Sequence, residues 1–171
     1  MPRQDMDFHL NKIDELAREI ENFVPPNRID AQAFRAHLAG LLVVTIAATY
    51  EACVKEVLIT HASNHHVAFG DFAQNNYNKI NSKIRVGDLK NYAKLFSNAL
   101  HTKFCTTLSQ RKNKINERLG KNIETNFEQI LNWRHSFAHA WVNSTTIEEA
   151  MITHRLAKRV LYAFDEALNG R

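Results

Sequence analysis

The stretch LAGLLVVTIAATY, residues 38–50, carries no charged side chain and is apolar on every side of the helix that it would form. A helix at a protein surface has a single apolar stripe, whereas a helix that is apolar all round is buried. With about 13 residues, the stretch is shorter than the roughly 18 to 20 that span a membrane. It predicts the buried middle of a long central helix, capped by Asp30 and ending near Ala62, and no membrane partner.

Four other segments place apolar residues at intervals of three and four, which marks one face of a helix. They lie at residues 5–23, 89–104, 124–139 and 147–169. Asp5, Asp88 and the pair Thr145-Thr146 are expected to cap three of these helices, while Pro25 and Gly170 follow two of their ends. These patterns predict helices on both sides of the central one.

The segments between these helices are polar. Residues 63–87 predict a long loop with at most a short helix, and residues 109–122 predict a loop with a helical turn. The 171 residues include only 5 Gly and 3 Pro, so turns are few and the regular elements are long. The sequence therefore predicts an all-α fold and a single domain over residues 1–171.

Cys53 and Cys105 stand far apart and form no C-x-x-C pair, which argues against a disulfide framework, a redox motif or a zinc ribbon. The first residues lack the basic region and apolar run of a signal peptide. We therefore expect a reducing, cytoplasmic location. A Gly-rich phosphate loop and an acidic metal cluster are also missing from the sequence, which argues against an ATPase, a polymerase or a two-metal nuclease.

Charge is distributed unevenly along the chain. Residues 79–121 hold 11 Lys or Arg against two acids, Asp88 and Glu117, so this segment carries +9 and the rest carries −5, within a net charge of +4. Such a segment would attract a polyanion such as RNA, although a solvated helix face is an equally good interpretation. The candidate RNA-binding residues are Lys79, Lys83, Arg85, Arg111, Lys112, Lys114 and Arg118.

Aromatic residues are interleaved with these basic residues, at Tyr77, Tyr92, Phe96 and Phe104. Aromatic rings can stack on bases. At helical spacing, however, they more often belong to a protein core, and we favour that interpretation.

Arg134 and His139 form an R-x4-H motif at the end of the helix predicted over residues 124–139. The guanidinium is a permanent cation, and the imidazole titrates near physiological pH. Together they suit metal-free phosphodiester cleavage, in which the imidazole moves a proton and the cation stabilises charge on the phosphate. The products would be a cyclic phosphate and a 5′-hydroxyl. The alternative is that Arg134 makes a surface ion pair and His139 is an interface histidine.

Five residues on a straight helix turn through about 140°, so Arg134 and His139 would point to rather different sides. They would share one cleft if the helix ended or loosened near Phe137. They would also do so if two copies of the chain met across a two-fold axis.

The residues RHSFAH, at positions 134–139, resemble the motif of the HEPN superfamily, in which an Arg and a polar residue precede a His. The stretch YEACVK, at residues 50–55, resembles the aromatic-Glu segment on the long helix of its RiboL-PSP-HEPN-like group. The stretch that begins VGDL at residues 86–89 and continues through Phe96 resembles the start of the third helix of that group. The resemblance extends from about Asp30 to Leu168.

This resemblance implies a four- to five-helix bundle that forms a homodimer and joins two such motifs. It also implies endoribonuclease activity without a cofactor, of the toxin or phage-defence type. Arg134 and His139 would be catalytic, His135 would be the polar neighbour, and Glu51 would orient Arg134 or His139. The family more often has Asn beside the Arg, so either His135 or His139 could transfer the proton.

Two features have simpler explanations. Glu51 could pair with Lys55, one turn along the same helix, instead of facing the site. His61 and His65 are also one turn apart, with His66 beside them, but we expect a solvated helix end because no convincing third metal ligand is nearby.

Two other functions fit the same sequence. HEPN domains also serve as non-catalytic dimerisation or RNA-binding modules, and such a module would bind RNA without cutting it. The protein could also be a toxin that an antitoxin holds silent, and toxicity on expression that is lost in His139→Ala would support this function. An activating partner protein is a further expected partner.

Overall fold

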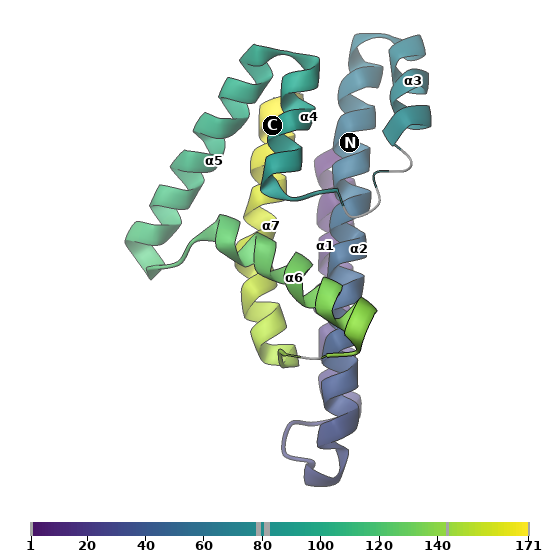
Figure 1. Ribbon diagram of the computed structural model, residues 1–171, viewed down its shortest axis with the longest axis vertical. Helices are drawn as coiled ribbons and strands as arrows, with labels where there is room; N and C mark the ends of the chain where they lie inside the picture. The colour runs from purple at the N-terminus through teal and green to yellow at the C-terminus, as the bar shows by residue number, and fades with distance from the viewer. Residues whose placement is uncertain (1, 78–79, 81–82, 143, 171) are drawn as a thin grey trace.

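The computed structural model describes residues 2–77, 80, 83–142 and 144–170, and this part of the chain folds into seven α-helices and one short 3₁₀ helix (Figure 1). These helices are α1 (Pro2–Phe23), η1 (Ile29–Ala31), α2 (Gln32–His65), α3 (Val67–Tyr77), α4 (Val86–Phe96), α5 (Asn98–Leu119), α6 (Ile123–Ala140) and α7 (Ile147–Asn169). The predicted all-α bundle is confirmed. Five long helices form it, and the two short ones, α3 and α4, flank its upper end in the view of Figure 1.

The central helix is α2, which packs against α1, α3, α6 and α7. Its inner face buries Ile46, Tyr50 and Leu58 completely, and the Tyr50 ring stacks on Phe127 of α6 with centroids 5.2 Å apart. Together with η1 it is the one described helix that is long and apolar enough to cross a membrane. Half of its most apolar window is buried inside the protein, and the core helix of a soluble protein meets the same criteria.

Three of the expected N-caps, Asp5, Asp30 and Asp88, are wrong. Helix α1 already begins at Pro2, so Asp5 lies in its first turn. Asp30 belongs to η1, and α2 follows with Ala31 at its N-cap and no side-chain cap. The last helix is as predicted, because the Thr146 side chain accepts a hydrogen bond from the Glu149 N–H at 3.1 Å and Gly170 ends the helix in the left-handed region.

The helix predicted over residues 89–104 is in fact divided. The backbone is extended at Ser97, whose hydroxyl accepts a hydrogen bond from the Leu100 N–H at 3.1 Å and caps α5. Asp88 is not the N-cap of α4, since it lies inside the first turn, where its side chain accepts a hydrogen bond from the Arg85 N–H at 3.0 Å. A serine side chain can cap a new helix, and this competes with continuation of the preceding helix through the same residue. At Ser97 the cap is formed and the helix is interrupted.

Residues 109–119 are helical, and the prediction of a loop over residues 109–122 was wrong. Their long polar side chains favour helices, and Leu108 and Ile115, two turns apart, are buried on one face of α5. The helix ends at Gly120, whose φ of +61° lies in the left-handed region. The polar segment 63–87 likewise contains more helix than expected, because α2 extends to His65 and α3 follows.

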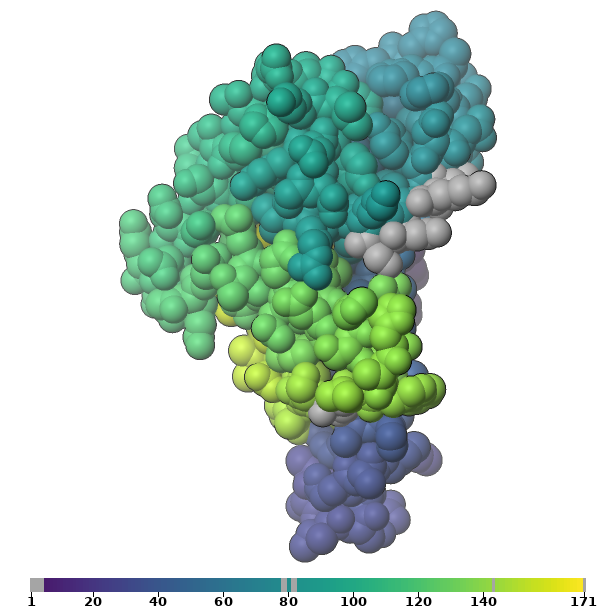
Figure 2. Space-filling model, viewed as in Figure 1, coloured from purple at the N-terminus to yellow at the C-terminus, as the bar shows by residue number. Residues whose placement is uncertain are grey.

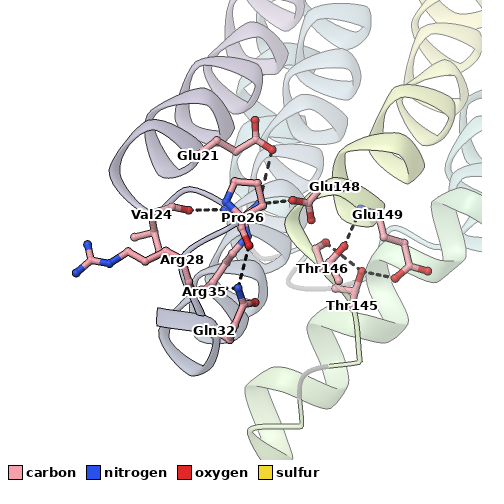
Figure 3. A network of polar contacts seen from close by, with 10 residues as sticks. All are labelled: Glu21, Val24, Pro26, Arg28, Gln32, Arg35, Thr145, Thr146, Glu148 and Glu149. Atoms are coloured by element: carbon pink, nitrogen blue, oxygen red, sulfur yellow. Dashed lines mark hydrogen bonds and ion pairs between the residues drawn. The ribbon is translucent and has the colours of Figure 1, made fainter. Parts of the chain in front are cut away.

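Buried Arg35 connects the turn after α1 to the start of α7 (Figure 3). Its guanidinium donates to the Val24 carbonyl in the turn after α1 and forms an ion pair with Glu148 at the start of α7. Glu21 lies 3.8 Å from the same guanidinium. A buried cation needs such partners to offset the loss of water. The network therefore holds the turn between α1 and α2 against the start of α7, the helix that follows α6 in the chain.

Candidate functional site

Helix α6 crosses in front of α2 and α7 and is held close to α2 by a small residue (Figure 1). Phe137, on the buried side of α6, packs against Gly40 of α2, where an added Cβ would lie only 2.1 Å from the Phe137 ring. A larger residue at position 40 would therefore push the two helices apart. This close crossing sets the position of the R-x4-H motif relative to α2.

Arg134 faces a carboxylate on the central helix. Its Nη2 lies 3.8 Å from Oε1 of Glu51, and the two side chains are 29% and 18% exposed. Because both side chains are partly shielded from water, the electrostatic attraction between them is stronger than that of a fully solvated ion pair. Of the two interpretations of Glu51, its orientation toward Arg134 is the one that this contact favours.

A small pocket of about 160 Å³ opens beside this pair, lined by Glu51, Arg85, Leu131, Arg134 and His135. The pocket brings two guanidinium groups and an imidazole together around a single carboxylate. Two cations can bind a phosphodiester and stabilise the charge that develops as it is cleaved, and an imidazole can transfer a proton.

Arg85 is placed in this pocket by two residues on α6. It forms an ion pair with Glu128 and donates from Nη2 to the Asn132 side-chain oxygen at 2.9 Å. Glu128 also accepts from the Val86 N–H at 2.9 Å, so it holds the start of α4 against α6. In the sequence, Arg85 belongs only to the basic segment, since no local pattern links it to a motif 49 positions away.

The two histidines of the motif lie together. Helix α6 remains regular to Ala140, and the rings of His135 and His139 are 4.5 Å apart between centroids. Both side chains are exposed, and the end of α6 forms part of the visible surface (Figure 2). Because the helix does not end near Phe137, Arg134 and His139 keep their separation of about 140°. Within one chain, His135 shares the pocket with Arg134, and His139 lies one turn farther along.

A family model, RiboL-PSP-HEPN, matches residues 9–170, which is nearly the whole chain. The chain belongs to this HEPN family. No curated protein and no solved structure matches it. Membership suggests a nuclease or an RNA-binding module, because HEPN domains are often ribonucleases.

The predicted RNA-binding residues of this HEPN domain do not form one surface. Arg85 belongs to the motif pocket, whereas Arg111, Lys114 and Arg118 line a groove between α5 and α7. Lys112 is paired with Glu124 at 3.1 Å. Lys83 is exposed beside α4. Lys79 lies outside the described residues.

The interleaved aromatic residues belong to the packed interior of the HEPN domain, as favoured above. Phe104 is completely buried and meets Phe164 of α7 edge to face, with centroids 5.2 Å apart. Tyr77, Tyr92 and Phe96 pack partly buried against the core. Their rings are therefore committed to packing rather than to stacking on bases.

His61 is a buried part of the structure. Burial lowers its pKa, and its Nδ1 donates to the Leu168 carbonyl at 2.7 Å. The edge of its ring meets His65, with centroids 4.7 Å apart. Within the described residues, no group of three or more His, Cys, Asp or Glu is arranged to hold a metal.

Proposed function

We propose that this HEPN domain is a metal-independent endoribonuclease that cuts RNA at the R-x4-H site. The observation that carries the proposal is the pocket in which Arg134 faces Glu51 while Arg85 and His135 line the same space. The guanidinium groups provide permanent positive charge for the phosphate, and the imidazoles of His135 and His139 can accept and donate protons.

In the proposed reaction, the ribose 2′-oxygen attacks the adjacent phosphorus as an imidazole takes the 2′-hydroxyl proton. The bond from phosphorus to the 5′-oxygen then breaks, and a proton passes to that leaving oxygen. The products are a 2′,3′-cyclic phosphate and a 5′-hydroxyl. Arg134 and Arg85 stabilise the charge that gathers on the phosphate oxygens, and Glu51 holds Arg134 in place.

A second copy of the chain would complete the site. His139 points about 140° away from Arg134 on a straight helix, so His139 of a partner could approach Arg134 across a two-fold axis. We propose that the exposed apolar side of α2 forms this contact. It carries Phe34 and Leu41, each 51% exposed. Gly40 is the residue of α2 that contacts α6. Leu41 is the next residue, so its side chain lies about 100° round the helix from that contact.

The decisive experiment is cleavage of total and transfer RNA in excess EDTA by the wild type, His135→Ala and His139→Ala, with the fragment ends identified. We expect the wild type to leave cyclic phosphates and at least one variant to lose about 100-fold or more in rate. The Arg85→Gln variant should lose about 10-fold or more, since it removes one charged donor.

Equal cleavage by the wild type and both histidine variants would contradict the proposal and indicate a contaminant or a different site. If the wild type binds RNA but never cuts it, the alternative holds: this is a non-catalytic HEPN dimerisation or RNA-binding module. Circular dichroism of each variant checks that a loss of cleavage is not a loss of folding.

A further inference from the structure

We propose that the groove between α5 and α7 binds phosphate groups of single-stranded RNA outside the nucleotide that is cut. The inference rests on the RNA-directed function proposed above. The groove has a volume of about 440 Å³ and shares no lining residue with the motif pocket. Its lining residues belong to α5 and α7. Figure 1 shows α5 on one side of the molecule and the C-terminal end of α6, which carries the motif, on the other.

Positive charge dominates the groove. Its lining holds four cations, Arg111, Lys114, Arg118 and Arg159, against one acid, Glu166. Arg111 forms an ion pair with Glu166, and no other ion pair within the described residues involves the remaining three cations. Like charges that gather without counterions repel one another, and a polyanion relieves this repulsion as it releases its own bound cations.

The four cations are brought together by the packing of two helices. Arg111, Lys114 and Arg118 follow one another at intervals of three and four, so they share one face of α5. Arg159 comes from the facing side of α7. Arg159 lies outside the basic segment of the sequence, so only the packing of α7 against α5 reveals it as a member.

The lining suits a phosphate backbone better than a base. No aromatic side chain lines the groove among the described residues, and its uncharged members are Thr107, Gln110 and Ile115. Recognition of an unpaired base relies on stacking against a flat ring. The groove should therefore bind RNA with little preference for sequence and with a strong dependence on salt.

A second groove on α7 provides an internal comparison. It lies against α1, has a similar volume of about 470 Å³ and contains Arg18 and Arg155, but it also contains Asp14, Glu21 and Glu148. Acids therefore outnumber cations there. The excess of positive charge is a property of the groove between α5 and α7, not of α7 grooves in general.

The test compares Arg118→Gln/Arg159→Gln with the matched control Arg18→Gln/Arg155→Gln, which removes the same charge from the other groove. The probe is a fluorescent 2′-O-methyl oligouridine of about 12 nucleotides, within the range that single-strand-binding folds cover. Its 2′-oxygens cannot attack, so binding is measured without cleavage. Fluorescence anisotropy over a series of salt concentrations gives the affinity and its salt slope.

We expect the groove variant to bind about 10-fold more weakly and to lose roughly 1.4 from the slope of log affinity against log salt, about 0.7 for each phosphate contact removed. The control should bind like the wild type. Equal weakening of both variants, or of neither, would overturn the inference. So would saturable binding of ATP that the groove variant alone loses, because the groove would then be a site for a free nucleotide.

The outcome for the groove is separate from the outcome for catalysis. A protein that never cuts RNA but loses oligouridine binding in the groove variant supports the groove and refutes the nuclease. A protein that cuts RNA while the groove variant binds like the wild type supports the nuclease and refutes the groove.

Discussion

At the scale of single residues, His154 combines complete burial with an ionisable ring. It is 0% exposed, and its Nδ1 shares a hydrogen bond of 2.9 Å with the Tyr50 hydroxyl. Burial lowers the pKa of His154 to about 3, and the positive charges of Lys158 and Arg155 act in the same direction. Its ring is thus held neutral at the centre of the bundle, where it supports the helix that also carries Glu51.

Acid should therefore destabilise the fold through His154. Its pKa is near 6.5 in the unfolded chain and about 3 in the folded protein, so the unfolded state binds more protons below pH 6.5. The stability that the neutral ring supports is present above pH 6.5 and is lost progressively toward pH 3. The loss from this group is about 2 kcal/mol at pH 5.

Urea unfolding at pH 7 and pH 5 measures this effect. The variant Tyr50→Phe/His154→Leu removes the titrating ring without leaving the tyrosine hydroxyl unpaired, so its stability should fall by about 2 kcal/mol less than that of the wild type between these pH values. An equal fall in both proteins would show that other groups cause the acid sensitivity.

At the scale of elements, the crossing of α6 over α2 depends on Gly40. A Cβ at this position would lie 2.1 Å from the Phe137 ring, so Gly40→Ala must displace the ring or the helix that carries it. We expect a loss of about 1 to 3 kcal/mol in the free energy of unfolding, and reduced RNA cleavage because α6 carries the motif.

The matched control is Gly87→Ala in α4, where an added Cβ meets nothing within 4 Å. A helical Gly→Ala change of this kind should leave stability unchanged or raise it by about 0.5 to 1 kcal/mol. The second-site variant Gly40→Ala/Phe137→Leu should recover part of the lost stability. If Gly40→Ala is as stable as Gly87→Ala, the close crossing does not limit the packing.

At the scale of the whole molecule, the proposed dimer joins Arg134 of one copy to His139 of the other. Arg134→Ala and His139→Ala should each be inactive alone. When the two are mixed and their subunits exchange, about half of the dimers contain one of each chain, and one of the two sites in such a dimer is intact. About a quarter of the wild-type activity should then return.

Cleavage of transfer RNA by the mixture, before and after subunit exchange, measures this recovery. Absence of recovery in a mixture that demonstrably contains mixed dimers would contradict a shared site. Leu41→Arg is the companion variant, since a charge on the proposed contact side of α2 should give a monomer in light scattering and abolish cleavage.

The local features of this protein were determined by its sequence. The period of three and four located α1, α6 and α7, and the uncharged apolar stretch at residues 38–50 located α2. Thr146 and Gly170 marked both ends of α7, because helix propensity and capping act over a few neighbouring residues. The residues of the R-x4-H motif were also visible, as they lie five positions apart. Local patterns were less decisive at Ser97 and over residues 109–119, where a cap and polar helix formers competed with the predicted boundaries.

Only the tertiary structure decided which distant residues meet. It places Arg85, held by Glu128, in one pocket with Arg134, and it places Arg159 in one groove with Lys114. It also shows that α6 remains α-helical to Ala140 and that His135 rather than His139 shares a pocket with Arg134 in one chain. These contacts follow from how whole helices pack, and the packing depends on the volumes and charges of side chains that are far apart in sequence.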